Sequence, residues 1–299
     1  MARDYVSIVK KNINRLLPVK LMEEKMKRLF TVFFLVLIAA TAFAGGQSEA
    51  GDSGFSGDYA FGGSTTVDPI ITAAIEEWKD IHPAVHISYE GVGSSNGVKG
   101  VISGQYSLGA ASREPKPKET DQGVKAIHVA LDAIAAVVNK NTVTISNLSI
   151  EELAGIYAGE IRNWKEVGGP DRGIVVFNRD EASGTYETFE SKVMGDYEFN
   201  AEAGVVTSNG DMAAKVGDTP YSIGYVGLGF VHEPGLKDLT LEGVKATIEN
   251  VYNMSYPVQR YLNVVHVGEL GEVEQAFVDY ILGDDGQAIV AELDFIPLP

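Results

Sequence analysis

Residues 179–185, in the order Arg-Asp-Glu-Ala-Ser-Gly-Thr, combine the side chains and spacing that best suit anion chemistry. They follow a short apolar run and precede a helix-like run. A strand that leads into a helix leaves the first amides of the helix without partners inside it. Ser183, Gly184 and Thr185 fall where those amides are exposed, and Arg179 adds a forked cation. The loop therefore suits an anion site, although a capped surface helix with an unrelated Arg has the same composition.

Two further segments repeat this chemistry. Residues 62–66 are Gly-Gly-Ser-Thr-Thr, and residues 91–97 are Gly-Val-Gly-Ser-Ser-Asn-Gly. Each is predicted to join a strand to a helix, and each offers glycines, small hydroxyls and a helix N-terminus. A tetrahedral oxyanion needs many convergent donors with little bulk. The three loops together predict an oxyanion site, with three unrelated turns as the alternative.

The elements that must position these loops alternate between strand and helix. Asp68 and Pro69 are predicted to be the N-cap and the first residue of a helix, and the apolar residues after them recur on one face. Alternating apolar and polar residues predict a strand over 85–90. Ser149 and Glu152 form a capping box for a helix that stops at Gly159. Repeated strand, loop and helix units, with further strands over 222–229 and 262–267, predict an α/β fold with mainly parallel sheets.

From about Asp58 to its end, the chain resembles the periplasmic phosphate-binding proteins of ABC uptake systems. The resemblance is carried by the order and spacing of segments 63–66, 89–95, 108–113, 163–169 and 179–185. In that family, phosphate lies between two lobes and is held by donors from both. The resemblance implies a two-lobed type II periplasmic-binding-protein fold. Each lobe would hold a mainly parallel sheet flanked by helices, and two crossings would form a hinge.

The resemblance also implies boundaries and ligands. Lobe I would comprise 58–132 plus 257–299, and lobe II would comprise 133–256. Closure over the anion would expel water and strengthen the hydrogen bonds inside. The implied phosphate ligands are Ser64, Thr65, Thr66, Ser94, Ser95 and Ser112 from lobe I, and Arg179, Ser183, Gly184 and Thr185 from lobe II.

One position departs from part of the family. Some members carry an Asp where this chain has Ser112, and that Asp accepts the proton of hydrogen phosphate and so rejects sulfate. Other branches carry Ser-Arg, as here. Asp132, inside the apolar run 129–138, is our candidate for the acceptor, with an exposed position at a strand end as the alternative. Arg113 either assists the anion or neutralises a nearby acid such as Glu114.

The N-terminal segment is predicted to be removed. Met26, Lys27 and Arg28 precede an apolar run over 29–40 and a small-x-small motif at 42–44, which indicates a secretory signal peptide cleaved after Ala44. The apolar run is shorter than the roughly 20 residues that span a bilayer. We expect Met26 to be the true start and 45–57 to be a flexible leader. The chain has no Cys, which excludes a lipid-carrying Cys and points to a periplasmic protein without a lipid anchor.

Charge limits the partners. The chain has 24 basic and 41 acidic residues, of which residues 1–44 hold eight and three. The remaining 16 basic and 38 acidic residues give a net charge of −22. Such a surface repels nucleic acid and anionic lipid. An anion site must therefore be local and preorganised. We expect inorganic phosphate and an inner-membrane ABC permease as partners, no cofactor, and a monomer.

Two rival functions stay open at this point. Residues 93–97 match G-x-S-x-G, the nucleophile elbow of serine hydrolases, with Ser95 as nucleophile and His232 or His266 as a partner. The second rival keeps the fold and binds sulfate, molybdate or tungstate, which need donors alone. A metal site is not expected, because a proline interrupts the helix that would align His82 with His86. We predict a binding protein that performs no chemistry.

Overall fold

The computed structural model describes residues 54–299. The predicted signal peptide and most of the predicted leader therefore lie outside the described residues. The first strand begins at Gly57, which pairs with Val85. No helix within 54–299 combines the length and the apolar character needed to cross a membrane.

The strands and helices follow one another in the predicted alternation. The strands are β1 (Gly57–Gly63), β2 (Val85–Glu90), β3 (Leu108–Ala111), β4 (Val124–Asn139), β5 (Asn147–Leu148), β6 (Val175–Arg179), β7 (Gly204–Val206), β8 (Ser222–Gly227), β9 (Leu236–Asp238), β10 (Thr240–Leu241) and β11 (Gln259–Val267). The α-helices are α3 (Asp68–Ile81), α4 (Ser94–Ser103), α5 (Pro117–Thr120), α6 (Ile150–Ala158), α7 (Gly184–Phe189), α8 (Asn209–Asp218), α9 (Ile248–Tyr252), α10 (Glu272–Leu282) and α11 (Asp284–Glu292).

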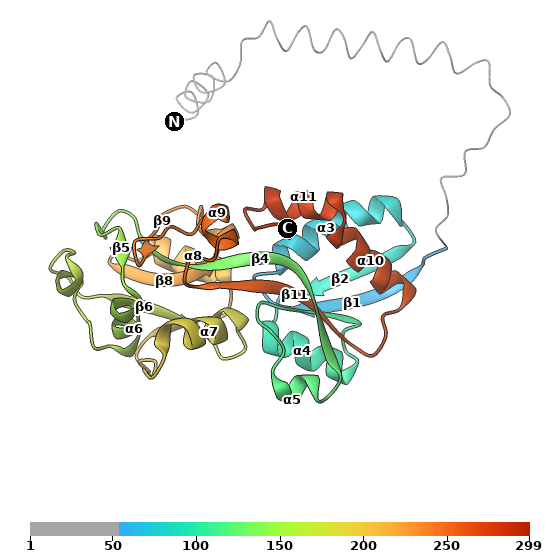
Figure 1. Cartoon of the computed structure of the whole chain (residues 1–299), viewed down its shortest axis with the longest axis horizontal. Helices are drawn as coiled ribbons and strands as arrows, with labels where there is room; N and C mark the ends of the chain where they lie inside the picture. Colours follow the sequence, from blue (N-terminus) through green and yellow to red (C-terminus); the bar gives the residue numbers. More distant parts are fainter. Residues whose placement is uncertain (1–53) are drawn as a thin grey trace, which may run out of the picture. The chain divides into compact units, whose positions relative to one another are not determined.

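Two long strands join the halves of the molecule. The main sheet has the order β2-β1-β3-β11-β4-β8-β6-β7, with β9 also paired to β4. Figure 1 shows β4 and β11 running through the middle, between the β1 end and the β6 end. The first part of β4 pairs with β11, and its last part pairs with β8. Strand β11 is antiparallel to β3 and β4, and β4 is antiparallel to β8. Strands β1, β2 and β3 are parallel to one another, and so are β6, β7 and β8. The α/β prediction with mainly parallel strands is confirmed.

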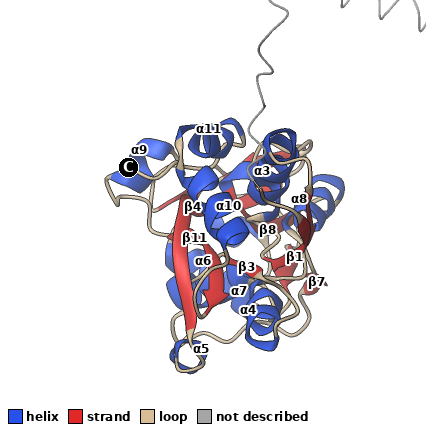
Figure 2. Cartoon of the chain, turned by 90° about the vertical axis from the view of Figure 1, so that its right-hand side faces the viewer, coloured by secondary structure: helices blue, strands red, loops and turns tan. Residues whose placement is uncertain are grey.

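Separate hydrophobic cores define the two lobes. In lobe I, Phe61, Trp78 and Phe277 pack together between β1, α3 and α10. In lobe II, Trp164 and Tyr225 belong to a second core. Helices α3, α10 and α11 cover one face of the lobe I strands, and α4 covers the other (Figure 2). The exact residue boundaries of the lobes stay a prediction.

Local sequence signals locate most element ends. The Ser149 hydroxyl accepts the Glu152 amide, and Gly159 ends α6 in the left-handed conformation, as predicted. The prediction that Asp68 caps α3 is wrong by one residue, because the helix already begins at Asp68 and Val67 is its N-cap. Strand β8 ends at Gly227 instead of continuing to 229, because Leu228–Phe230 forms a 3-10 turn.

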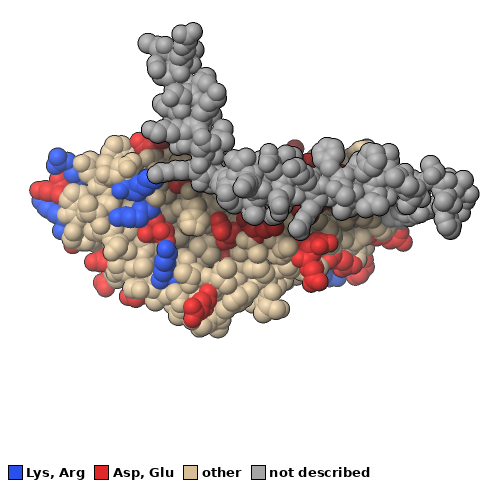
Figure 3. All heavy atoms as spheres, turned by 90° about the horizontal axis from the view of Figure 1, so that it is seen from above, with Lys and Arg blue, Asp and Glu red and all other residues tan. Residues whose placement is uncertain are grey.

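Charged side chains are unevenly distributed on the surface. On the face seen in Figure 3, acidic side chains are spread along the molecule, while Lys and Arg gather toward the left end. The overall charge is acidic, with a formal value of −17 for the full chain. Any attraction for an anion must therefore come from buried groups close to it.

Candidate anion-binding site

The three predicted loops meet between the lobes. Residues 62–66 connect β1 to α3, 91–97 connect β2 to α4, and 179–185 connect β6 to α7. Because parallel strands deliver the loops at their carboxyl ends to one edge, these segments converge. The predicted strand-to-helix context of all three loops is confirmed.

Arg179 lies at the centre of this convergence. Its side chain is buried, with 2% of the residue exposed. One terminal nitrogen, Nη2, donates to Thr65 Oγ1 at 3.2 Å and to the carbonyl of Thr207 at 2.9 Å. The other two guanidinium nitrogens, Nε and Nη1, are buried and have no hydrogen-bond partner among the described residues. Two buried cationic N–H groups without acceptors are what an anion would satisfy.

Hydroxyl groups from both lobes surround this position. Thr66 Oγ1 lies 3.1 Å from Thr185 Oγ1, which joins the lobe I loop to α7. The amide nitrogen Nδ2 of Asn209 donates to Thr66 Oγ1 at 2.9 Å and to Thr65 Oγ1 at 3.3 Å. Small hydroxyls are flexible donors that fit around a tetrahedral anion.

Ser94, Ser112 and Gly184 form a second side of the site. The Ser94 hydroxyl lies 3.2 Å from that of Ser112 and accepts the Ser112 amide at 3.0 Å. A Cβ at position 184 would lie 2.4 Å from Ser94 Oγ and 2.7 Å from Ser112 Oγ. Glycine therefore lets the first turn of α7 approach both hydroxyls, as close backbone approach requires.

A buried ion pair missed by the sequence analysis completes the site. Arg260 Nε and Nη2 donate to Asp132 Oδ2 at 3.0 and 2.8 Å, and Leu228 donates its amide to Asp132 Oδ1 at 2.9 Å. Arg260 also donates to Thr185 Oγ1 at 3.0 Å and to Thr66 Oγ1 at 3.3 Å. Asp132 thus lies buried behind Arg260, which connects it to the hydroxyl cluster.

Burial affects the pKa of all three charged groups. It lowers the pKa of Arg179, and the nearby charge of Arg260 adds to that effect. Burial also lowers the pKa of Arg260, and the charge and hydrogen bonds of Asp132 oppose this shift. Burial raises the pKa of Asp132, and the charge of Arg260 limits the rise. With the short contacts to Arg260 we treat Asp132 as ionised, so these three groups carry a net charge of one positive unit.

Some predicted site residues have other contacts. The Ser64 hydroxyl accepts the amides of Thr66 and Val67 and so shapes the first loop. The Ser183 hydroxyl accepts the Tyr186 amide and caps α7. Ser95 lies at the mouth of the site, where its hydroxyl donates to Glu187 Oε1 at 2.7 Å.

Sequence reasoning had little access to Arg260 and Asn209. Arg260 lies opposite Asp132 in the β4–β11 ladder, a register that a single sequence does not display. Asn209 begins α8 directly after its N-cap Ser208, and a polar residue at a helix start is too common to indicate a binding site. A buried basic residue in an apolar strand was the available signal for Arg260.

Comparisons with known proteins agree with this geometry. The fold and the site between the lobes define a binding protein of the PBP superfamily, whose domain model matches residues 48–285. The phosphate-binding protein PstS of Borreliella burgdorferi is 34% identical over 246 residues, covering 79% of this chain and 88% of that protein. PstS of Bacillus subtilis is 31% identical over 274 residues, covering 89% and 91%. The chain therefore belongs to the PstS family of phosphate-binding proteins within that superfamily.

Solved structures support the same assignment. A substrate-binding protein from Clostridium perfringens, solved with bound phosphate, matches with a TM-score of 0.78 and 34% identity over 81% of this chain and all of that one. An ABC-type phosphate transport receptor from Vibrio cholerae matches with a TM-score of 0.68 and 29% identity, again over 81% and 100%. The predicted two-lobed fold is confirmed.

The serine hydrolase alternative is not supported. Ser95 contacts Glu187 and Arg113, neither of which can act as the imidazole of a catalytic triad. The family is one of binding proteins, so the chain is a binding protein and not an enzyme.

Proposed function

We propose that this protein captures inorganic phosphate between its lobes. The main support is the state of Arg179, whose Nε and Nη1 groups are buried and lack hydrogen-bond partners among the described residues. A phosphate bound beside the guanidinium would accept from these donors through different oxygens and would neutralise the buried charge. The relative from Clostridium perfringens with bound phosphate supports the same ligand.

The arrangement explains how an acidic protein binds an anion. Thr65, Thr66, Ser94 and Thr185 provide hydroxyl donors, and α7 directs the amides of its first turn toward the same space. Hydrogen bonds to a charged group contribute about 1.5 to 3 kcal/mol each. Charge at contact distance in a buried site outweighs the screened repulsion of the surface.

Selectivity between phosphate and sulfate is a separate part of the proposal. Donors alone serve either anion, whereas the proton of hydrogen phosphate needs an acceptor. We keep Asp132 as the candidate. Its hydrogen bonds from Arg260 and Leu228 mean that it would accept such a proton only by sharing or exchanging one of them.

The family and the predicted signal peptide support a proposal for the biological setting. We propose that the chain is exported through the signal at 26–44, acts as a monomer in the periplasm and delivers phosphate to an ABC permease in the inner membrane. The Vibrio cholerae relative, described as an ABC-type phosphate transport receptor, supports delivery to such a system.

Calorimetric titration tests the ligand. Purified protein freed of bound anion is titrated with phosphate, sulfate and molybdate at neutral pH, and sulfate then competes against phosphate. We expect saturable binding of one phosphate and no displacement by an equal concentration of sulfate. Displacement of phosphate by sulfate at comparable concentration would show that the phosphate assignment is wrong.

A further inference from the structure

A second charged cluster lies at the mouth of the site. We call it the mouth cluster and define it as Ser95, Arg113, Lys116, Glu119 and Glu187. Arg113 donates to both carboxylate oxygens of Glu119, at 2.8 and 2.9 Å. Glu187 Oε2 lies 2.9 Å from Arg113 Nε and 2.6 Å from Lys116 Nζ. Its other oxygen accepts the Ser95 hydroxyl.

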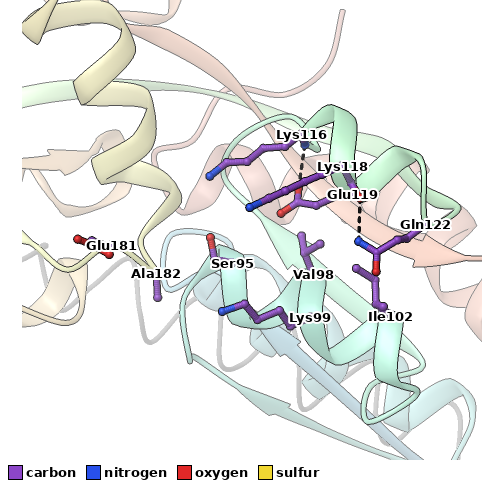
Figure 4. A pocket seen from close by; sticks show the side chains of 10 residues that line it. All are labelled: Ser95, Val98, Lys99, Ile102, Lys116, Lys118, Glu119, Gln122, Glu181 and Ala182. Carbon is purple, nitrogen blue, oxygen red and sulfur yellow. Dashed lines mark hydrogen bonds between the residues drawn. The ribbon is translucent and has the colours of Figure 1, made fainter.

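The cluster borders an open pocket between the lobes. The pocket has a volume of about 500 Å³, with Ser95, Lys99, Lys116, Lys118 and Glu119 on one wall and the 181–182 segment on the other. In Figure 4 the amino groups of the three lysines extend toward the side where Glu181 and Ala182 lie. The mouth cluster is therefore at the place where the lobes separate.

Glu187 is the member that reaches across from lobe II. It lies on α7, three residues after Gly184, so it moves with the helix whose first turn faces the anion. Its side chain is 13% exposed and that of Arg113 is 6% exposed. The same contact region includes a backbone hydrogen bond of 3.0 Å from the Ser95 amide to the Ala182 carbonyl.

Backbone geometry confirms how closely the lobes approach here. Gly93 has φ of +91°, and a Cβ at this position would lie 2.8 Å from the Ala182 carbonyl oxygen. Only a glycine fits this approach without strain. The contact between the 91–97 loop and the 181–182 segment is thus part of the closed arrangement.

The contacts of Glu119 and Glu187 respond differently to opening. Arg113 and Glu119 both lie in lobe I, so their pair persists when the lobes separate. The contacts of Glu187 to Ser95, Arg113 and Lys116 exist only when the lobes are together. A contact shifts a conformational equilibrium only when it differs between the two states.

We propose that Glu187 is a latch that favours the closed form and slows phosphate release. The cluster contains two basic and two acidic side chains, so its charges balance without a bound anion. The latch can therefore act on lobe closure without a contact between Glu187 and the anion. The part that concerns release rests on the proposed capture of phosphate.

The test compares Glu187→Gln with Glu190→Gln in the purified full chain. Both changes remove one negative charge, but Glu190 is exposed and accepts a hydrogen bond from Tyr186 within lobe II. Phosphate release is followed by stopped flow, and the distance between dyes on the two lobes is measured without phosphate. We expect Glu187→Gln to release phosphate about tenfold faster with an almost unchanged association rate, and to be more open without ligand. Glu190→Gln should match the unmodified protein.

A salt series and a second variant test the role of the Glu187 contacts further. Added salt should speed release from the unmodified protein only slightly, because Lys116 is partly exposed, whereas Arg113 and Glu187 are largely buried and little screened, and it should have still less effect on Glu187→Gln. Lys116→Gln, which alters a partly exposed side chain, should give a smaller change in the same direction and should not add fully to Glu187→Gln. Unchanged release and unchanged lobe distance in Glu187→Gln would overturn the latch. If neither protein bound phosphate, the proposed function would fail, while the lobe distance would still test the latch.

Discussion

The anion site and the mouth cluster are both buried or half-buried sets of charged side chains between the same two lobes. In the anion site, Asp132 pairs with Arg260 only, and two N–H groups of Arg179 lack partners among the described residues. In the mouth cluster, two basic side chains face Glu119 and Glu187. The two regions therefore use similar residues with a different balance of charge.

This difference separates a ligand site from a contact between lobes. An unpaired buried cation costs free energy until something supplies the opposite charge. A bound anion can supply it at the first region, which links binding to closure. At the second region the protein supplies the opposite charge itself, because Glu119 and Glu187 lie against Arg113. The presence of a buried Arg is thus less informative than whether a carboxylate of the protein already pairs with it.

Removing the unpaired cation should have the largest effect. We expect Arg179→Ala to weaken phosphate binding by about 10² to 10⁴, or about 3 to 5 kcal/mol, because the anion loses its main counter-charge in a buried site. Calorimetry on both proteins measures the ratio. Arg179→Lys is the matched variant, since it keeps the charge but not the fork, and should bind with intermediate affinity. An Arg179→Ala protein that binds as tightly as the unmodified one would remove Arg179 from the site.

Altering the buried carboxylate should have the next largest effect. Asp132→Asn leaves Arg260 without its charged partner, so we expect the free energy of unfolding without phosphate to fall by about 3 kcal/mol. We also expect weaker phosphate binding and reduced discrimination against sulfate. Urea unfolding and competition calorimetry measure the two effects separately. If selectivity is retained, the acceptor of the phosphate proton lies elsewhere.

Local sequence signals predicted the fold and the three loops, but not the full site. The helix that ends at Gly159 and the Arg179 loop depend on residues close together in the chain, where capping and turn chemistry act. Arg260 depends instead on its register with Asp132, which lies 128 residues away. The mouth cluster likewise joins Ser95 to Glu187 across 92 residues. Such pairings arise from tertiary packing and leave no periodic pattern in one sequence.

The smallest predicted effect distinguishes the two acids of the mouth cluster. Burial alone would raise the pKa of Glu119, but hydrogen bonds and charge from Arg113 lower it below its ordinary value of 4.5. A lowered pKa in the folded state means that Glu119 stabilises the protein above that ordinary value, and that this contribution is lost as the pH falls through the lowered pKa. We expect Glu119→Gln to reduce the free energy of unfolding by about 1 kcal/mol at neutral pH and to flatten its decline in acid.

The rate of phosphate release should distinguish Glu119 from Glu187. Because Glu119 and Arg113 lie in the same lobe, their pair is present in the open and closed forms alike and cannot bias closure. Glu119→Gln should therefore release phosphate at nearly the unmodified rate, whereas Glu187→Gln should release it faster. Urea unfolding across a pH series and stopped-flow release measure the two quantities on the same proteins. Equal acceleration by both substitutions would mean that the whole cluster, and not Glu187 in particular, controls closure.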